Sequence, residues 1–277
     1  MDLTSEIERN VAAALAEDLG SGDATAPLTP ASTMSRATVT CRQNAVVCGQ
    51  LWFDACFRKL DARVAISWLV AEGAVVNAGT RVCEVRGEAR AMLAAERSAI
   101  NFLQTLSAVA TATRRLVDAA AGTRARIVDT RKTLPGLRFA QKYAVRTGGG
   151  SNHRMGLYDA MLIKENHIAA AGSVEQALVQ AQKHARPGIW MQIEVENLSQ
   201  LRKALDAGAT MILLDNMSPD QMREAVRIAG DRAQLEASGG ITLENVRAIA
   251  ETGVHRISSG SLTKDVKAVD FSMRFET

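Results

Sequence analysis

The chain has 277 residues, of which 47% are hydrophobic and 23% charged, and its formal net charge is +3. This balance is typical of globular proteins and excludes disordered chains, collagen-like repeats and disulfide scaffolds. No stretch approaches 18 consecutive apolar residues, the length needed for a membrane-spanning helix. The start of the chain carries the acids Asp2, Glu6 and Glu8, where a signal peptide would need basic residues. We therefore expect a soluble, cytoplasmic protein without membrane segments. The four cysteines form no C-x2-C pair, which favours reduced core thiols over a zinc or redox site. Few aromatic residues and a small net charge argue against nucleic-acid binding.

The first hundred residues predict a small α/β domain. Apolar residues recur at every fourth position from Ser5 to Leu19, which predicts an amphipathic helix. Between Ala37 and Val85, short β-branched runs broken by glycines predict a small sheet with a helix across it. Residues 91–121 contain no Gly or Pro and carry apolar residues at helical spacing, so they predict a long helix joining two parts of the chain. We place the domain boundary near residue 108.

The rest of the chain repeats one pattern, a short β-branched run followed by a polar turn and a helical stretch. The runs cover residues 127–128, 160–163, 189–195, 211–214, 234–235 and 256–258. Such alternation predicts parallel strands covered by helices on both faces. We therefore expect an incomplete, open α/β barrel of six or seven strands over residues 109–264. The rival fold, a doubly wound dinucleotide-binding sheet, loses support because no G-x-G-x-x-G follows any of these runs.

Polar residues follow every predicted barrel strand, at the end where βα barrels carry their active sites. These segments are Asp129–Lys132, Lys164–His167, Glu194–Asn197, Asp215–Asn216, Ser238–Gly240 and Ser258–Ser261. Charged side chains at the ends of apolar strands are costly unless they face a ligand or one another. Salt bridges that only close the barrel mouth are the alternative interpretation.

The positive charge is concentrated in one segment. Residues 123–154 hold eight basic residues and one acid, interrupted by Pro135 and three consecutive glycines. This mixture indicates a loop built around anions rather than a solvated helix face. Basic side chains within this segment and shortly after it can hold carboxylate or phosphate oxygens; they are Arg131, Lys132, Arg154 and Lys164.

Acidic residues and small turns are also predicted at the strand ends that form the candidate site. Glu194 and Glu196 share one face of a strand and Asp215 ends the next, so these acids can hold sugar hydroxyls or a divalent cation. The turns after the last two strands lead toward helices, which offers backbone N–H groups and a helix dipole to a phosphate. We expect one site for an anionic molecule and a phosphorylated sugar. Among the histidines, His153 is the candidate for a role in it, whereas His167 equally suits a structural role.

Several long motifs resemble the quinolinate phosphoribosyltransferase family. They are DTRKTLPGLR at 129–138, GGGSNHRMGLYD at 148–159 and IKENHI at 163–168, with further likeness at 96–101, 194–196, 213–216, 262–264 and 270–275. The resemblance covers essentially the whole chain. It implies an N-terminal α/β sandwich, an incomplete α/β barrel and a C-terminal segment, residues 265–277, that returns to the first domain.

The resemblance also implies an activity and its site. The reaction joins quinolinate to 5-phosphoribosyl 1-pyrophosphate with Mg²⁺, gives nicotinate mononucleotide, pyrophosphate and carbon dioxide, and belongs to NAD biosynthesis. Lys132, Glu194 and Asp215 correspond to catalytic positions, and the two acids also to the metal side. The implied substrate-binding residues are Arg97, Thr130, Arg131, Lys132, His153, Arg154, Lys164, Glu194, Asp215, Ser238, Gly239, Gly240, Ser259, Gly260 and Ser261. The family implies a homodimer in which Arg97 reaches the neighbouring subunit's site.

Three alternatives remain open from the sequence. A pyrophosphorylase-like paralogue associated with molybdenum transport shares part of the first motif. A barrel lyase would use Lys164 or Lys132 as a Schiff-base amine on a phosphosugar. A binding or scaffold protein would instead pair its strand-end charges with one another.

Overall fold

The computed structural model describes residues 2–276, whose contacts divide into two compact units. The first unit contains the described residues up to Ala112, then Leu134–Gly149 and the residues from Val266 onward. The second contains Thr113–Thr133 and Gly150–Asp265. Met1 and Thr277, which the sequence analysis counted in the first domain and the tail, lie outside the described residues.

One segment falls in a different unit from the one the sequence suggested. The sequence pattern predicted that residues 134–149 belong to the barrel, whereas their contacts group them with the first unit. The reason is helix α4 (Arg138–Thr147), which buries Ala140, Ala144 and Val145 in the hydrophobic core of that unit. A helical stretch that lies between two barrel strands in the sequence therefore belongs to the first unit.

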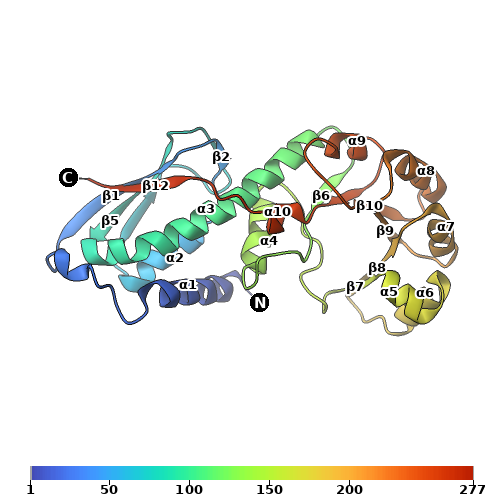
Figure 1. The fold of residues 1–277 in the computed structure, drawn as a ribbon, viewed down its shortest axis with the longest axis horizontal. Coiled ribbons are helices and arrows are strands. Elements are labelled where there is room, and N and C mark those ends of the chain that lie inside the picture. Colours follow the sequence, from blue (N-terminus) through green and yellow to red (C-terminus); the bar gives the residue numbers. More distant parts are fainter. Residues whose placement is uncertain (1, 277) are drawn as a thin grey trace. The chain divides into compact units, whose positions relative to one another are not determined.

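The first unit is built on a four-stranded antiparallel sheet with the order β12-β1-β5-β3. Its strands are β1 (Met34–Cys41), β3 (Ala65–Trp68), β5 (Arg81–Glu88) and β12 (Phe271–Phe275), and β2 (Ala45–Val46) pairs separately with β4 (Val75–Val76). Figure 1 shows β12, from the end of the chain, beside β1 from near its start. The C-terminal segment thus belongs to the first unit.

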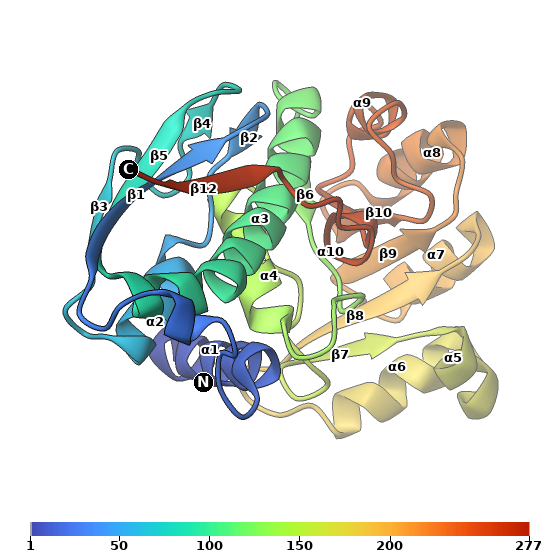
Figure 2. The same ribbon diagram turned by 60° about the vertical axis from the view of Figure 1, so that its left-hand side comes forward.

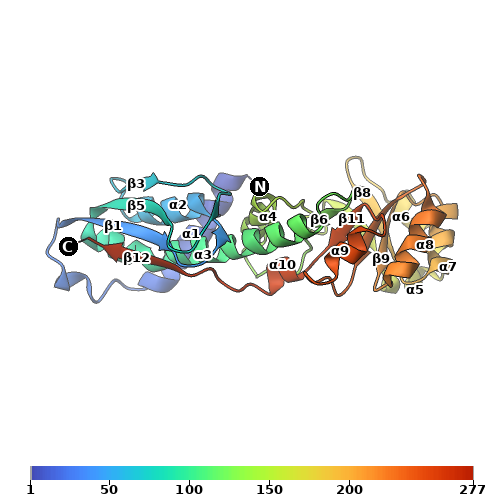
Figure 3. The ribbon, with the colours of Figure 1, turned by 90° about the horizontal axis from the view of Figure 1, so that it is seen from above.

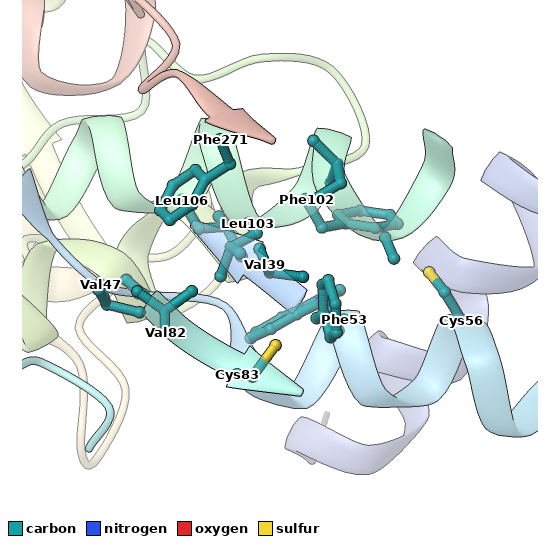
Figure 4. Close-up of a cluster of buried hydrophobic side chains, with 14 of the residues drawn as sticks. Val39, Val47, Phe53, Cys56, Val82, Cys83, Phe102, Leu103, Leu106 and Phe271 are labelled. Atoms are coloured by element: carbon teal, nitrogen blue, oxygen red, sulfur yellow. The ribbon is translucent and has the colours of Figure 1, made fainter. Parts of the chain in front are cut away.

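Helices pack against this sheet, and residues of both form the hydrophobic core of the first unit. The helices are α1 (Leu3–Leu19), a 3-10 turn (Ala26–Leu28), α2 (Gln50–Leu60) and α3 (Ala89–Ala119). Figure 4 shows Val39 and Cys83 of the sheet directed toward Phe53 of α2 and Leu103 of α3. All four cysteines are buried free thiols, which confirms the prediction made from their spacing. Helix α1 begins two residues earlier than predicted because the Asp2 side chain accepts the Ser5 N–H at 2.9 Å.

The second unit contains a six-stranded parallel sheet, and each of its strands corresponds to a predicted run. The strands are β6 (Arg126–Val128), β7 (Ala160–Ile163), β8 (Trp190–Val195), β9 (Met211–Asp215), β10 (Gln234–Ser238) and β11 (Arg256–Ser258). Their order is β6-β11-β10-β9-β8-β7, so β6 and β7 are the two edges and, within residues 2–276, no ladder joins them. The strand order is that of a sheet that has not closed on itself.

Helices alternate with these strands, as the βα pattern predicts. They are α5 (Glu165–Ala171), α6 (Val174–Lys183), α7 (Leu198–Asp206), α8 (Pro219–Ala229), α9 (Val246–Ala250) and α10 (Ser261–Lys264). Figures 2 and 3 show α6, α7 and α8 on the outer side of the strands. The central residues of β9 and β10 are buried, as expected for a parallel sheet covered on both faces. Among the described helices, none has the length and apolar character needed to cross a membrane.

Candidate active site

A cavity of about 860 Å³ lies in the second unit, where the strands of the parallel sheet end. Its lining includes every site residue predicted from the sequence except Arg97, which lies on an exposed part of α3. The shared members are Thr130, Arg131, Lys132, His153, Arg154, Lys164, Glu194, Asp215, Ser238, Gly239, Gly240, Ser259, Gly260 and Ser261. Residues from all six strand ends therefore meet in one concavity, because parallel strands end on the same side of their sheet.

The loop after β6 holds Lys132 against the turn after β11. Thr130 Oγ1 accepts the Lys132 N–H at 3.0 Å, and Thr263 donates its hydroxyl to the Lys132 carbonyl at 2.8 Å. A Cβ at Gly260 would lie 2.9 Å from Lys132 Cδ, so only glycine fits this close approach without displacing the lysine. The backbone and the aliphatic stem of Lys132 therefore lie against a turn that can offer N–H groups to an anion.

Two guanidinium groups lie close to each other on the cationic side. Arg154 is 7% exposed, and burial followed by the positive charge of Arg131 lowers its pKa, while Asp159 and Glu194 act in the opposite direction. Like charges held this near to one another favour an anion between or above them. A planar dicarboxylate matches this pair of forks better than a single carboxylate does.

His153 lines the same cavity, but the protein occupies both of its ring nitrogens. Nδ1 accepts the Arg154 N–H at 2.8 Å, and Nε2 lies 3.0 Å from Gln192 Oε1. Because Nδ1 accepts a hydrogen bond, the proton of the neutral ring must be on Nε2, and Nε2 therefore donates to Gln192 Oε1. We infer that His153 positions the neighbouring Arg154 and shapes the wall, rather than donating a free hydrogen bond.

Lys164, a cation that follows β7, is paired with one of the acids that line the cavity. Lys164 Nζ lies 2.9 Å from Glu194 Oε2, so the salt-bridge interpretation holds for this pair. Burial raises the pKa of Glu194, Lys164 lowers it, and the charges of Asp215 and Glu165 raise it again. An amine held in an ion pair is not free to attack a carbonyl, which weakens the lyase alternative for Lys164.

Asp215 is oriented by an unusual backbone conformation at the next residue. Asn216 has φ +53°, its N–H donates to the Ser238 carbonyl at 2.9 Å, and its Nδ2 donates to Asp215 Oδ2 at 2.7 Å. Gly239 has φ +98°, and a Cβ there would lie 2.1 Å from Asn216 Oδ1. The turn after β10 therefore needs glycine so that Asn216 can hold the carboxylate in place.

This contact predicts an effect on stability. Gly239→Ala is expected to lower the free energy of unfolding by about 3 kcal/mol, because it combines a positive φ with a clash. Gly208→Ala is the matched control, since its φ is +82° but nothing lies within 4 Å of the added Cβ; it should cost only about 1 kcal/mol. Urea unfolding followed by circular dichroism measures both, and equal losses would show that the Asn216 contact is unimportant.

The turns after β10 and β11 differ from the prediction in one respect. The helices that follow them, α9 and α10, have only five and four residues, and α9 begins at Val246, well after Gly240. Helices this short supply only a small dipole, so the predicted phosphate site would depend mainly on the turns themselves. Backbone N–H groups and the hydroxyls of Ser259 and Ser261, 2.7 Å apart, remain available to a phosphate.

Glu236 lines the cavity from β10 and is 1% exposed, and it was not among the residues predicted for the site. Its Oε2 accepts from Gln192 Nε2 and pairs with Arg256 Nε, each at 3.2 Å. Its Oε1 has no hydrogen-bond partner among the described residues and lies 3.6 Å from His153 Nε2. Residues two apart on a strand share a face, so the prediction for Ser238 could have been extended to Glu236.

The acids of the site do not form a complete protein cage for a metal. Within the described part of the chain, no three His, Cys, Asp or Glu side chains are grouped to hold an ion. Glu194 and Asp215 nevertheless lie close enough for the charge of one to raise the pKa of the other. Two carboxylates beside turns that offer hydrogen-bond donors fit Mg²⁺, which usually keeps several waters and binds one or two carboxylates together with substrate phosphates.

Comparisons with known proteins agree with this geometry. Family models described as the N-terminal and C-terminal domains of quinolinate phosphoribosyl transferase match residues 23–107 and 109–274. A Bacillus subtilis protein named probable nicotinate-nucleotide pyrophosphorylase (carboxylating) is 41% identical over 93% of this chain and 89% of its own. A tobacco quinolinate phosphoribosyltransferase (decarboxylating) is 37% identical over 99% and 83%.

A solved structure of a related protein has a fold similar to that of this chain. The nicotinate-nucleotide pyrophosphorylase of Francisella tularensis has a TM-score of 0.95 and 41% identity, covering 100% of this chain and 98% of that one. The chain belongs to the quinolinate phosphoribosyltransferase family.

Proposed function

We propose that this enzyme transfers the phosphoribosyl group of 5-phosphoribosyl 1-pyrophosphate to quinolinate, with loss of carbon dioxide, in NAD biosynthesis. The products are nicotinate mononucleotide, pyrophosphate and carbon dioxide. One observation carries the proposal: a single cavity joins the cations that follow β6 and β7 to the acids that end β8 and β9 and the glycine turns that follow β10 and β11. Family membership supports the same reaction.

The cationic wall suits quinolinate. Arg131 and Arg154 are close enough for one charge to lower the pKa of the other, and Lys164 lies on the neighbouring loop. A second carboxylate on the pyridine ring would relieve this repulsion, and charge-assisted hydrogen bonds to guanidinium fix the plane of the ring. We expect the ring to be held with its nitrogen toward the ribose.

The charges of the cavity match those that develop during transfer. Breaking the bond from the anomeric carbon to pyrophosphate makes the sugar cationic and the leaving group more anionic. Glu194 and Asp215 would stabilise the sugar and Lys132 the leaving group, so catalysis is mainly electrostatic preorganisation. The pyridine nitrogen attacks without a general base because it carries no proton.

Decarboxylation follows from the new bond. The quaternary ring nitrogen withdraws electrons, so the bond from C2 to its carboxylate breaks, the electron pair stays on the ring, and C2 takes up a proton. Holding the ring in line and excluding water from the cationic sugar are the contributions expected of the protein. We propose Mg²⁺ as the cofactor, with Glu194 and Asp215 on its protein side; when bound it would neutralise charge on the pyrophosphate.

We also propose that the enzyme works in the cytoplasm as a homodimer with shared active sites. Arg97 is exposed on α3 and is the one predicted substrate-binding residue that does not line the cavity. An arginine supplied by a second copy would add a further cation to the quinolinate side. In a twofold dimer each protomer would both give and receive this residue.

Substrate preference tests the proposal. The kcat/KM for quinolinate should exceed that for nicotinate by roughly thirtyfold, because a cation facing a missing carboxylate costs about 2 kcal/mol. Product formation from each acid with 5-phosphoribosyl 1-pyrophosphate and Mg²⁺, followed by chromatography, measures both values. Equal values would show that the cationic wall does not recognise the second carboxylate, and no nicotinate mononucleotide from either acid would overturn the proposed reaction.

The pH dependence of kcat provides a further prediction. Glu194 acts as an anion, so kcat should fall as pH drops through its pKa, which burial raises and Lys164 lowers. Lys164→Met removes the lowering effect and should move the acid limb upward by about one pH unit. Lys183→Met, on the exposed end of α6, is the control and should leave the limb in place. An unchanged limb in Lys164→Met would assign the titration to another group.

A further inference from the structure

A second cavity, of about 570 Å³, opens at the other end of the parallel sheet. Its lining includes the first residue of five of the six strands, namely Arg126, Trp190, Met211, Gln234 and Arg256. The candidate active site forms where these strands end, so the two cavities lie at opposite ends of the same strands. We call this second concavity the amino-end cavity. The reaction proposed above uses none of its lining residues.

The amino-end cavity is positively charged. Three arginines and one histidine line it, and none of its lining residues is acidic: Arg124, Arg126, Val128, Ser151, Asn152, Trp190, Met211, Gln234, His255 and Arg256. Arg124 and Arg126 are exposed and, within the described chain, neither lies within ion-pair distance of an acid. The charge of this concavity is therefore only partly compensated from within the protein.

The cationic groups differ in how firmly they are held. The Arg256 guanidinium lies 5.7 Å from the centre of the Trp190 ring, and its Nε lies 3.2 Å from Glu236 Oε2. Arg124 donates from Nε to the Gly253 carbonyl at 2.6 Å, which leaves its terminal nitrogens for other acceptors. Arg256 thus supplies a fixed wall, while Arg124 and Arg126 can adjust to a bound group.

His255 reports on this charge. Its Nδ1 accepts the Leu235 N–H at 3.1 Å, which directs the ring. Burial and then the positive charge of Arg124 lower the pKa of His255, while Asp231 acts in the opposite direction. An anion bound among these groups would offset the charge of Arg124 and raise the pKa of the histidine.

We propose that the amino-end cavity binds a phosphate-bearing anion. Guanidinium groups match phosphate oxygens in pairs, and a dianion gains more from Arg124 and Arg126 together than a single carboxylate does. The polar side chains of Ser151 and Gln234 add hydrogen-bonding groups around it. The phosphate belongs either to free inorganic phosphate or to a nucleotide, and the two sources differ in the affinity they predict.

The test follows the His255 ring signals by NMR while the full chain is titrated with inorganic phosphate or with adenosine 5′-monophosphate at constant ionic strength. Saturable movement of the His255 signals and a rise in its pKa are expected. A tenfold lower half-saturation for the nucleotide identifies a nucleotide site, and equal values identify a free-phosphate site. Phosphate bound at the candidate active site does not contact His255, so the reading is specific to this cavity.

Variants separate binding from general charge effects. Arg124→Gln and Arg126→Gln should each weaken the response about tenfold, the scale of one lost charge-assisted hydrogen bond. Arg223→Gln, an exposed arginine on α8 outside the cavity, is the matched control and should leave it unchanged. The proposal is overturned if sodium chloride moves the His255 signals equally, if no movement saturates, or if the cavity variants respond like the control.

Discussion

Lys132→Met and Asp215→Asn are each expected to lower kcat by roughly a hundredfold, the scale of one lost electrostatic contact to a transition state. Methionine keeps the chain that packs beside Gly260 but removes the charge, and asparagine keeps an oxygen for the Asn216 amide. The proposed mechanism places Lys132 on the leaving pyrophosphate and Asp215 on the sugar. Steady-state kinetics with both substrates saturating measures the loss.

The same variants should still bind quinolinate, because the cationic wall is intact. Isothermal titration calorimetry with quinolinate alone should therefore give affinities within about threefold of the wild type, a difference below 1 kcal/mol. Lys183→Met serves again as a surface control with unchanged kcat. Near-normal turnover in both site variants would mean that the two residues only support the fold, and the charges of the cavity would need another assignment.

Mixing two inactive variants is expected to restore activity if the proposed dimer shares its sites. Arg97→Ala removes the residue given to the partner, and Lys132→Ala disables the cavity that receives it. Random reassociation makes about half of the dimers mixed, each with one intact site, so about a quarter of wild-type activity should return. Activity after subunit exchange, with exchange followed by native mass spectrometry, measures this.

A second mixture controls for nonspecific rescue. Lys132→Ala and Asp215→Ala both damage the same cavity, so every site in their mixed dimers carries one defect and no activity should return. If exchange is complete and the Arg97→Ala mixture also stays inactive, Arg97 acts within its own subunit or has no role in catalysis. A chain that stays monomeric at micromolar concentration would contradict the proposed dimer itself.

Much of the second unit could be predicted from the sequence because its signals are local. A buried parallel strand needs a short apolar run, and the six runs correspond to β6 through β11. Strand ends then fix which residues share an edge, so Arg131, Lys164, Glu194 and Asp215 could be placed together before any coordinates. The free, buried state of the four cysteines followed in the same way from their spacing.

Sequence patterns by themselves determined the elements and the edge of the sheet at which the polar residues meet. The reason is that hydrophobic periodicity and the alternation of strands with helices can be recognised in short segments. Only the tertiary structure decided which charges pair, such as Lys164 with Glu194 and Arg256 with Glu236, since those partners lie 30 and 20 residues apart. It also decided that α4 packs in the first unit, because its buried face is complementary to a core formed elsewhere in the chain. Periodicity shows that a face is apolar but does not name the surface that covers it.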